Sequence, residues 1–262
     1  MNILFIADIF GRPGREAVRG HLPQIIEEEN IDLCIANVEN AAGGNGVTPS
    51  LAYEFFRMGI HVLTSGNHIW DRKEIFGYLD DEPRLLRPAN YPNTAPGHGL
   101  FVGETNQKIP YAIINLQGRI FLPAIDCPFQ IGQGLVDQLR PKTKVILVDF
   151  HAEATAEKQA LSWFLDGKVS AVLGTHTHVA TADERILPKG TAYITDVGMT
   201  GPHDSIIGVN TNIIEPKFLN QTPARFEPAK GNVQINAVKI KVDTETGCST
   251  SIKRLLRKAE SV

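Results

Sequence analysis

Short runs rich in Ile, Val and Leu alternate with amphipathic stretches through the first two thirds of the chain, and this alternation limits the folds open to it. Seven runs have the length of strands buried on both faces: 3–7, 31–38, 60–64, 111–116, 145–150, 171–174 and 192–195. Apolar residues recur at helical spacing over 14–29, 49–58, 72–79 and 154–165, with Asp71 and Thr155 where N-caps would lie. This order predicts an α/β fold.

The chain changes character after residue 200. Pro202, Pro216, Pro223 and Pro228 argue against helices and central strands there. Two alternating runs, 233–242 and 249–256, then predict an antiparallel pair.

An earlier segment, 87–108, holds Pro and Gly turns without a long periodic run, so we interpret it as an irregular excursion that could cover a pocket. We find no internal repeat or linker. We therefore predict a single domain over residues 1–262, with a small cap formed by about 87–108.

Composition excludes several classes of protein. With 42% apolar and 21% charged residues, the 262-residue chain is typical of globular proteins and not of disordered or fibrous ones. Its three cysteines, Cys34, Cys127 and Cys248, form no CxxC pair, so neither a disulfide framework nor a cysteine zinc site is expected.

Charge and hydropathy limit the partners. The net charge is −3 and no run of Lys or Arg precedes the last few residues, so we expect no stable binding of long nucleic acid. The apolar runs are too short to cross a membrane, and the first residues lack the basic start of a signal peptide. We expect a cytoplasmic protein, with homo-oligomers left open.

Polar side chains follow the predicted strands at the points where they end. They are Asp8 after the first run, Glu39 and Asn40 after the second, Asn67 and His68 after the third, His151 after the fifth, and His176 and His178 after the sixth. Ligand sites in open α/β sheets lie outside the carboxyl ends of strands. These residues are therefore the candidates for a functional site.

Each candidate taken singly also has an ordinary structural explanation. Asp8 could cap a helix or form a turn. A His-x-His pair such as His176 and His178 is often a surface or packing feature, although an extended segment would place both rings on one face. Joint occurrence at successive strand ends favours the functional interpretation, whereas we interpret three other histidines as structural: His21, His61 and His98.

The residue types indicate a metal centre. Mixed carboxylate, amide and imidazole ligands suit borderline transition metals, whereas calcium and magnesium prefer oxygen alone. Seven potential ligands besides His68 are too many for one tetrahedral zinc ion. The number fits two metal ions that share a bridging ligand.

Two motifs carry a resemblance to a known family. Gly-Asn-His at 66–68 and Gly-Thr-His-Thr-His at 174–178 resemble the blocks of the calcineurin-like metallophosphoesterases. Two departures narrow the match: Phe10 replaces the histidine of the usual D-x-H block, and the bridging acid Glu39 is followed by Asn40. Together with segments 87–90, 149–155 and 195–202, these features resemble the YmdB-like branch of that family.

The resemblance implies a fold and a ligand assignment. The fold would be a metallophosphoesterase-like β-sandwich of two mixed sheets flanked by helices, in four layers α/β/β/α. His68 would be the proton donor. The implied ligands are Asp8, Glu39, Asn40 and His178 for metal one, and Glu39, Asn67, His151 and His176 for metal two.

The resemblance also implies an activity. YmdB-like members are bacterial, cytoplasmic phosphodiesterases that act on cyclic nucleotides with iron or manganese centres. We therefore expect two divalent transition-metal ions, iron first and manganese or zinc as alternatives. The predicted function is hydrolysis of small cyclic nucleotides, above all 2',3'-cyclic ones, by a hydroxide that bridges the metals, with His68 protonating the leaving oxygen.

Several alternatives stay open. The same ligands would serve a phosphomonoesterase or protein phosphatase, and a regulatory scaffold could carry a purely structural metal centre. Either Asp71 or Asp149 could orient a ring nitrogen. The loop at 201–208 is either a plain turn or part of the substrate mouth.

Overall fold

Two β-sheets pack face to face in the computed structural model, which describes residues 1–259. The first sheet runs in the order β2 (Asp8–Ile9), β11 (Met199–Pro202), β12 (Val233–Val242), β1 (Asn2–Ile6), β3 (Leu33–Asn37) and β4 (Val62–Thr64), with β13 (Ser249–Lys258) paired to β12. The second runs β5 (Leu100–Glu104), β6 (Pro110–Gln117), β7 (Val145–His151), β8 (Ala171–Thr175), β10 (Ala192–Ile194) and β9 (Arg185–Ile186).

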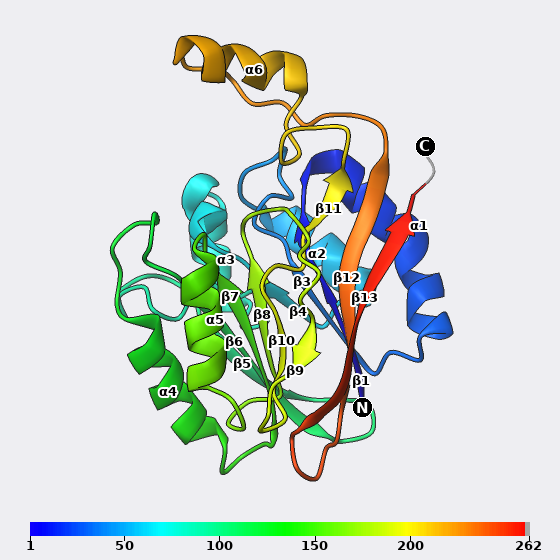
Figure 1. The fold of residues 1–262 in the computed structure, drawn as a ribbon, viewed down its shortest axis with the longest axis vertical. Helices are drawn as coiled ribbons and strands as arrows, with labels where there is room; N and C mark the ends of the chain where they lie inside the picture. Colours follow the sequence, from blue (N-terminus) through cyan, green and yellow to red (C-terminus); the bar gives the residue numbers. More distant parts are fainter. Residues whose placement is uncertain (260–262) are drawn as a thin grey trace.

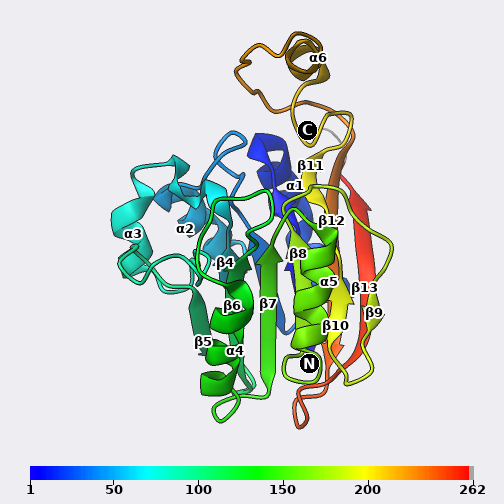
Figure 2. The same cartoon turned by 60° about the vertical axis from the view of Figure 1, so that its left-hand side comes forward.

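Helices cover the outer faces of both sheets (Figures 1 and 2). The first sheet is covered by α1 (Gly11–Glu28), α2 (Pro49–Arg57) and α3 (Ile75–Asp81), and the second by α4 (Pro128–Leu139) and α5 (Thr155–Phe164). The predicted four-layer α/β/β/α arrangement is confirmed.

Side-chain alternation along the strands creates these layers. In β1, Ile3 and Phe5 enter the core between the two sheets, while Leu4 and Ile6 pack under the helices with Val18 of α1. Because both faces of the strand are buried, the sequence reads as a continuous apolar run. The same reasoning accounts for the seven predicted strands, all of which are present, and the late antiparallel pair is confirmed as β12 and β13.

The four predicted helices are present, but both predicted N-caps are wrong. Within the described chain, α3 begins after Glu74 and α5 after Ala154, and neither helix has a side-chain cap. Thr155 is the first residue inside α5, and Asp71 belongs to the preceding 3-10 helix η1 (Asn67–Asp71).

Regular structure also occurs where prolines and turns argued against it. Asn210 caps α6 (Thr211–Asn220) by accepting from Asn212 N at 3.0 Å, and this helix contains Pro216. β11 tolerates Pro202 because proline falls at its last residue, where the ladder ends. β5 (Leu100–Glu104) lies inside the segment 87–108, so the irregular parts are residues 87–99 and 105–108. That the segment forms a cap stays a prediction.

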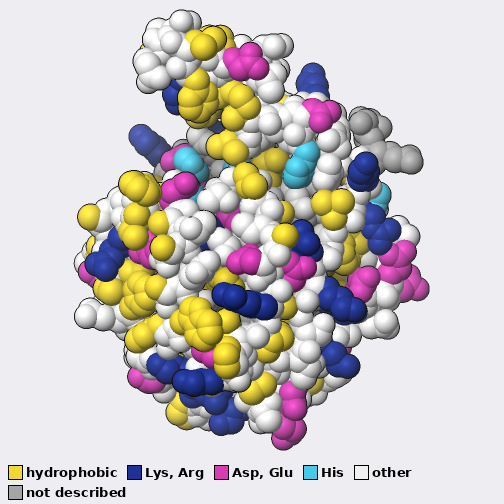
Figure 3. Space-filling view, in the orientation of Figure 1, with side chains coloured by type: hydrophobic (Ala, Val, Ile, Leu, Met, Phe, Trp, Pro, Cys, Tyr) yellow, Lys and Arg dark blue, Asp and Glu magenta, His cyan; other side chains and the backbone are white. Residues whose placement is uncertain are grey.

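Helix α6 stands away from the rest of the molecule (Figures 1 and 2). Apolar side chains on and near it, including Phe218 and Leu219, are exposed (Figure 3). In residues 1–259, no helix combines the length and the hydropathy needed to cross a membrane.

Candidate metal centre

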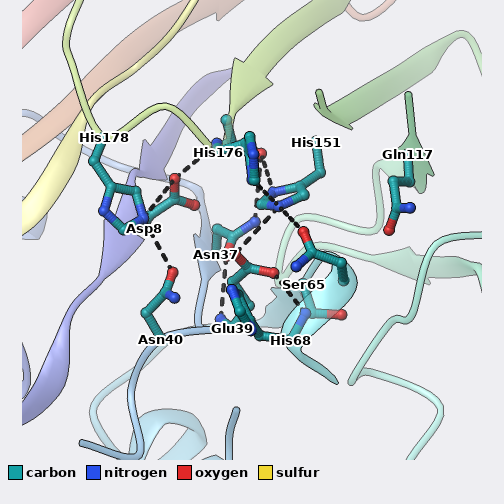
Figure 4. A network of polar contacts seen from close by, with 12 residues as sticks. Asp8, Asn37, Glu39, Asn40, Ser65, His68, Gln117, His151, His176 and His178 are labelled. Atoms are coloured by element: carbon teal, nitrogen blue, oxygen red, sulfur yellow. Dashed lines mark hydrogen bonds and ion pairs between the residues drawn. The ribbon is translucent and has the colours of Figure 1, made fainter. Parts of the chain in front are cut away.

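The predicted site residues meet at the carboxyl ends of the parallel strands. β1, β3 and β4 run parallel in the first sheet, and β6, β7 and β8 run parallel in the second. Contacts across the sandwich place these two edges together: Asn37 Nδ2, at the end of β3, donates to Asp149 Oδ2 of β7 at 3.0 Å. The candidate side chains from both sheets therefore converge (Figure 4).

One group of ligand atoms gathers around His151. Its Nε2 lies 3.2 Å from Glu39 Oε1, 3.2 Å from Asn67 Oδ1 and 2.9 Å from His176 Nδ1. Ligand atoms of Glu39, His151 and His176 all lie within 4.8 Å of one another. This group holds the four residues that the resemblance assigns to metal two.

Two successive hydrogen bonds fix the orientation of the His151 ring. Thr175 Oγ1 donates its single proton to Asp149 Oδ1 at 2.7 Å, so it must accept from His151 Nδ1 at 3.0 Å. His151 Nε2 therefore faces the carboxylate, amide oxygen and imidazole nitrogen of its neighbours, all of which can offer electron pairs. Such a set of donors fits a cation, because several lone pairs point at one another with few protons to share.

The charges of this group lead to the same conclusion. Burial alone would lower the pKa of His151, but the carboxylates of Glu39, Asp8 and Asp149 together outweigh burial and raise the pKa to about 9. Burial likewise opposes ionisation of Glu39, yet His151 holds the pKa of Glu39 at about 2. The proton on His151 thus occupies the place of a positive ion, and metal binding would displace it. Burial and the charge of His151 lower the pKa of His176 to about 3, which keeps that ring neutral.

A second group contains Asp8, Asn40 and His178. His178 Nδ1 lies 2.9 Å from the carbonyl oxygen of Ile207 and must donate to it, so His178 Nε2 carries a lone pair. That nitrogen lies 3.2 Å from Asn40 Oδ1 and 3.8 Å from Asp8 Oδ2. Asn40 presents its oxygen because its amide nitrogen donates to Gly44 O at 2.8 Å.

Asp8 is buried and only partly satisfied. Its Oδ2 accepts from His176 N at 2.9 Å, whereas its Oδ1 has no hydrogen-bond partner within residues 1–259. Burial, together with the nearby acids, raises its pKa well above the ordinary value. An unpaired buried carboxylate oxygen beside two lone-pair donors fits the position of a metal ligand.

Gly66 leaves the space that the first group needs. A Cβ at this position would overlap the His151 ring and the Glu39 carboxylate. The backbone φ of Gly66 is −145°, so the requirement for glycine here comes from space and not from conformation. This explains why the Gly-Asn-His motif begins with glycine.

Phe10, which stands where the wider family has a histidine, supports the centre by packing. Its buried ring meets the His178 ring edge-on at 5.6 Å between centroids. Gly44 and Gly208 lie so close to it that a Cβ on either would crowd the ring. Phe10 therefore restrains the His178 ring without offering a ligand atom.

His68 lies at the edge of the centre. Its backbone N donates to Glu39 Oε2 at 3.2 Å, and its Nδ1 lies 2.8 Å from Asp71 Oδ2. One third of its side chain is exposed, which leaves the ring accessible to a ligand. Asp71 thus orients His68, while Asp149 orients His151 through Thr175.

Other histidines lie in structural roles or apart from the two groups. His61 Nδ1 accepts from Cys34 N at 3.1 Å, beside β3. The loop 201–208 touches the centre through the Ile207 carbonyl. Two residues that support the centre were not predicted from the sequence: Thr175, which stands inside the Gly-Thr-His-Thr-His motif, and Asn37, two residues before Glu39.

The family model described as "YmdB-like protein" matches residues 4–255 of this chain. The chain belongs to the YmdB-like family. A 2',3'-cyclic-nucleotide 2'-phosphodiesterase of Bacillus subtilis (strain 168) is 48% identical over 256 residues, which cover 98% of this chain and 97% of that protein.

Two solved structures share the YmdB-like fold seen here. A protein from Thermus thermophilus is 40% identical, with a TM-score of 0.93 over 99% of this chain and 100% of that one. A phosphatase from Mycoplasma pneumoniae is 34% identical, with a TM-score of 0.92 over 98% of this chain and 93% of that one. Phosphodiesterases and phosphatases are hydrolases of phosphoric esters, and this YmdB-like chain is an enzyme of that class.

Proposed function

We propose that the chain hydrolyses 2',3'-cyclic nucleotides at a centre of two divalent transition-metal ions. The observation that carries the proposal is the convergence of two groups of lone-pair donors, one around His151 and one around His178, at a single edge of the sandwich. When bound there, the ions would polarise a phosphoryl group and acidify an attacking water. Glu39 would be the ligand common to both ions.

The ligand set also indicates which metals to test. Imidazole, amide oxygen and carboxylate together suit iron, manganese or zinc better than calcium or magnesium. We propose iron first. The reducing cytoplasm is the proposed compartment, in keeping with the free thiols of Cys34, Cys127 and Cys248.

The charge of the centre favours a diester. Two divalent ions would carry four positive charges, and the carboxylates of Asp8 and Glu39 carry two negative charges. The centre would therefore keep a net positive charge that attracts an anion. A cyclic diester carries one negative charge, whereas a monoester dianion would be held more tightly and leave more slowly. The 48% identical phosphodiesterase of Bacillus subtilis acts on 2',3'-cyclic nucleotides by name, which supports the choice of this ring over a 3',5' ring.

His68 is the proposed general acid. Opening the ring breaks one P–O bond, and the departing ribose oxygen is too basic to leave without a proton. In the imidazolium form of His68 both ring nitrogens carry a proton: Nδ1 donates to the Asp71 carboxylate, and the Nε2 proton is the one passed to that oxygen. The partly exposed ring allows the sugar to approach.

A substrate panel tests the proposal. We expect kcat/KM to be highest for 2',3'-cyclic AMP among four compounds assayed with one metal: 2',3'-cyclic AMP, 3',5'-cyclic AMP, 3'-AMP and a phosphoserine peptide. A clear preference for a monoester would favour a phosphomonoesterase or protein phosphatase instead. Metal-loaded protein that turns over none of them would favour a scaffold.

A further inference from the structure

The loop that carries His176 and His178 has a strained backbone. His176 has φ of +102° and His178 has φ of +63°, a region that residues other than glycine seldom adopt. Such conformations persist only where the surroundings over-determine them. The intervening residue, Thr177, is where this loop is anchored.

The carboxylate of Asp196 holds Thr177 in place. Its Oδ2 accepts from Thr177 N at 3.1 Å and from Thr177 Oγ1 at 2.8 Å, and its Oδ1 accepts from Gly198 N at 2.9 Å. Its backbone adds two bonds, since Thr181 N donates to Asp196 O at 3.0 Å and Asp196 N donates to Thr181 Oγ1 at 2.9 Å. Asp196 therefore ties down the loop both between the histidines and just beyond them.

A buried lysine completes the arrangement. Lys158 Nζ lies 2.7 Å from Asp196 Oδ2, and both side chains are buried, at 0% and 1% exposure. Lys158 comes from α5, on the outer face of the second sheet (Figure 2), so its stem must pass β8 to reach the loop. Gly174 leaves that passage free, because a Cβ there would crowd Lys158 Cδ and overlap the carbonyl of Thr195.

Stability alone does not account for this pair. Two charges removed from water each lose much of their solvation free energy, and replacing such pairs by apolar residues is often neutral or stabilising. The charged form does supply something an apolar pair would not: a carboxylate with enough acceptor capacity for Lys158 and for both donors of Thr177.

We propose that the buried pair of Lys158 and Asp196 is a positioning device that holds His176 and His178 in the geometry that binds metal. Neither residue contacts the ligand atoms of the centre in the described structure; the pair acts through Thr177. The inference rests on the metal site of the proposed function.

Three variants separate positioning from stability. Lys158→Met leaves Asp196 buried without its partner, so it should destabilise the fold. Lys158→Met/Asp196→Asn removes both charges together and should recover most of the lost melting temperature. Thr177→Val keeps the pair and removes only the hydroxyl that donates to Asp196. Lys239→Met, which breaks the half-buried Lys239–Glu29 pair, is the matched control.

The readout is the dissociation constant for Mn²⁺ of the metal-stripped full chain, measured by calorimetry beside the melting temperature of the same sample. We expect the folded double variant and Thr177→Val to bind Mn²⁺ about 10 to 100-fold more weakly than wild type, the range known for groups that support metal ligands. Lys239→Met should bind like wild type. At saturating Mn²⁺ the kcat of Thr177→Val should approach the wild-type value, because binding of the ion itself restores the loop.

Two results would contradict the inference. If the folded double variant and Thr177→Val bind Mn²⁺ as tightly as wild type, the pair is only structural, and the proposed function is untouched. If wild type itself binds no Mn²⁺, iron or zinc, both the proposed function and this inference are wrong. Should the double variant not fold, Thr177→Val alone decides between these results.

Discussion

The ring of His68 and the carboxylate of Asp71 lie 2.8 Å apart, Nδ1 to Oδ2, within one short 3-10 helix. The helix begins at Asn67, a proposed metal ligand, so it places an imidazole and its orienting acid directly beside the centre. Asp71 serves this pair and does not cap α3. The relationship defines which nitrogen of His68 is available to a leaving group.

We expect His68→Ala to lower kcat for 2',3'-cyclic AMP by about 10²-fold or more while metal content stays unchanged, because general acid catalysis contributes a factor of this size. An activated aryl phosphodiester has a good leaving group and should be affected much less. Asp71→Asn should show the same pattern with a smaller loss. Equal losses for both substrates would assign His68 to binding or assembly.

Asn40→Ala should weaken one of the two metal sites, since Asn40 Oδ1 faces His178 Nε2 and Phe10 offers no ligand atom beside that ring. Elemental analysis after brief dialysis should give close to two ions per wild-type chain and close to one for the variant. Asn93→Ala, at an exposed loop position, is the control. Unchanged stoichiometry in Asn40→Ala would remove Asn40 from the ligand set.

Gly66→Ala should abolish metal binding at the His151 group, because the added methyl would occupy space held by the His151 ring and the Glu39 carboxylate. Gly20→Ala in α1 is a matched control: a Cβ there meets nothing within 4 Å among residues 1–259, and alanine favours helix. Metal titration and turnover of both variants measure the difference. Full activity of Gly66→Ala would show that the His151 ring and the Glu39 carboxylate can move to accommodate the added methyl group.

Phe10→Ala should reduce the free energy of unfolding by about 3–5 kcal/mol, the usual loss for a buried phenylalanine. Urea denaturation in the presence of a chelator measures this without any metal contribution. Phe121 is 88% exposed, so Phe121→Ala should change the free energy of unfolding by no more than about 0.5 kcal/mol. A mild effect of Phe10→Ala would mean that the Phe10 ring contributes little to the packing around His178.

The pattern of apolar runs predicted an α/β fold and the positions of the candidate site residues, whereas the two-sheet sandwich and the ligand assignment followed from the family resemblance. Strands buried on both faces must be continuous apolar runs, which is why β1, β3, β7 and β8 could be read directly. Parallel strands end at a common edge, so the polar residues that follow them could be expected to meet without knowledge of the pairing. Local spacing was sufficient for both conclusions.

The orientation of the site residues depends on contacts between distant parts of the chain. Asn40 and His178 are 138 residues apart, and Asp8 and the backbone of His176 are 168 apart, so the orientation of these groups has no local signal. The anchoring of the histidine loop by Lys158 and Asp196 is equally invisible, because a lysine on a helix ordinarily faces water. The Lys158 side chain reaches the interior because Gly174 has no Cβ to block it. This space forms when β8, β10 and α5 pack together.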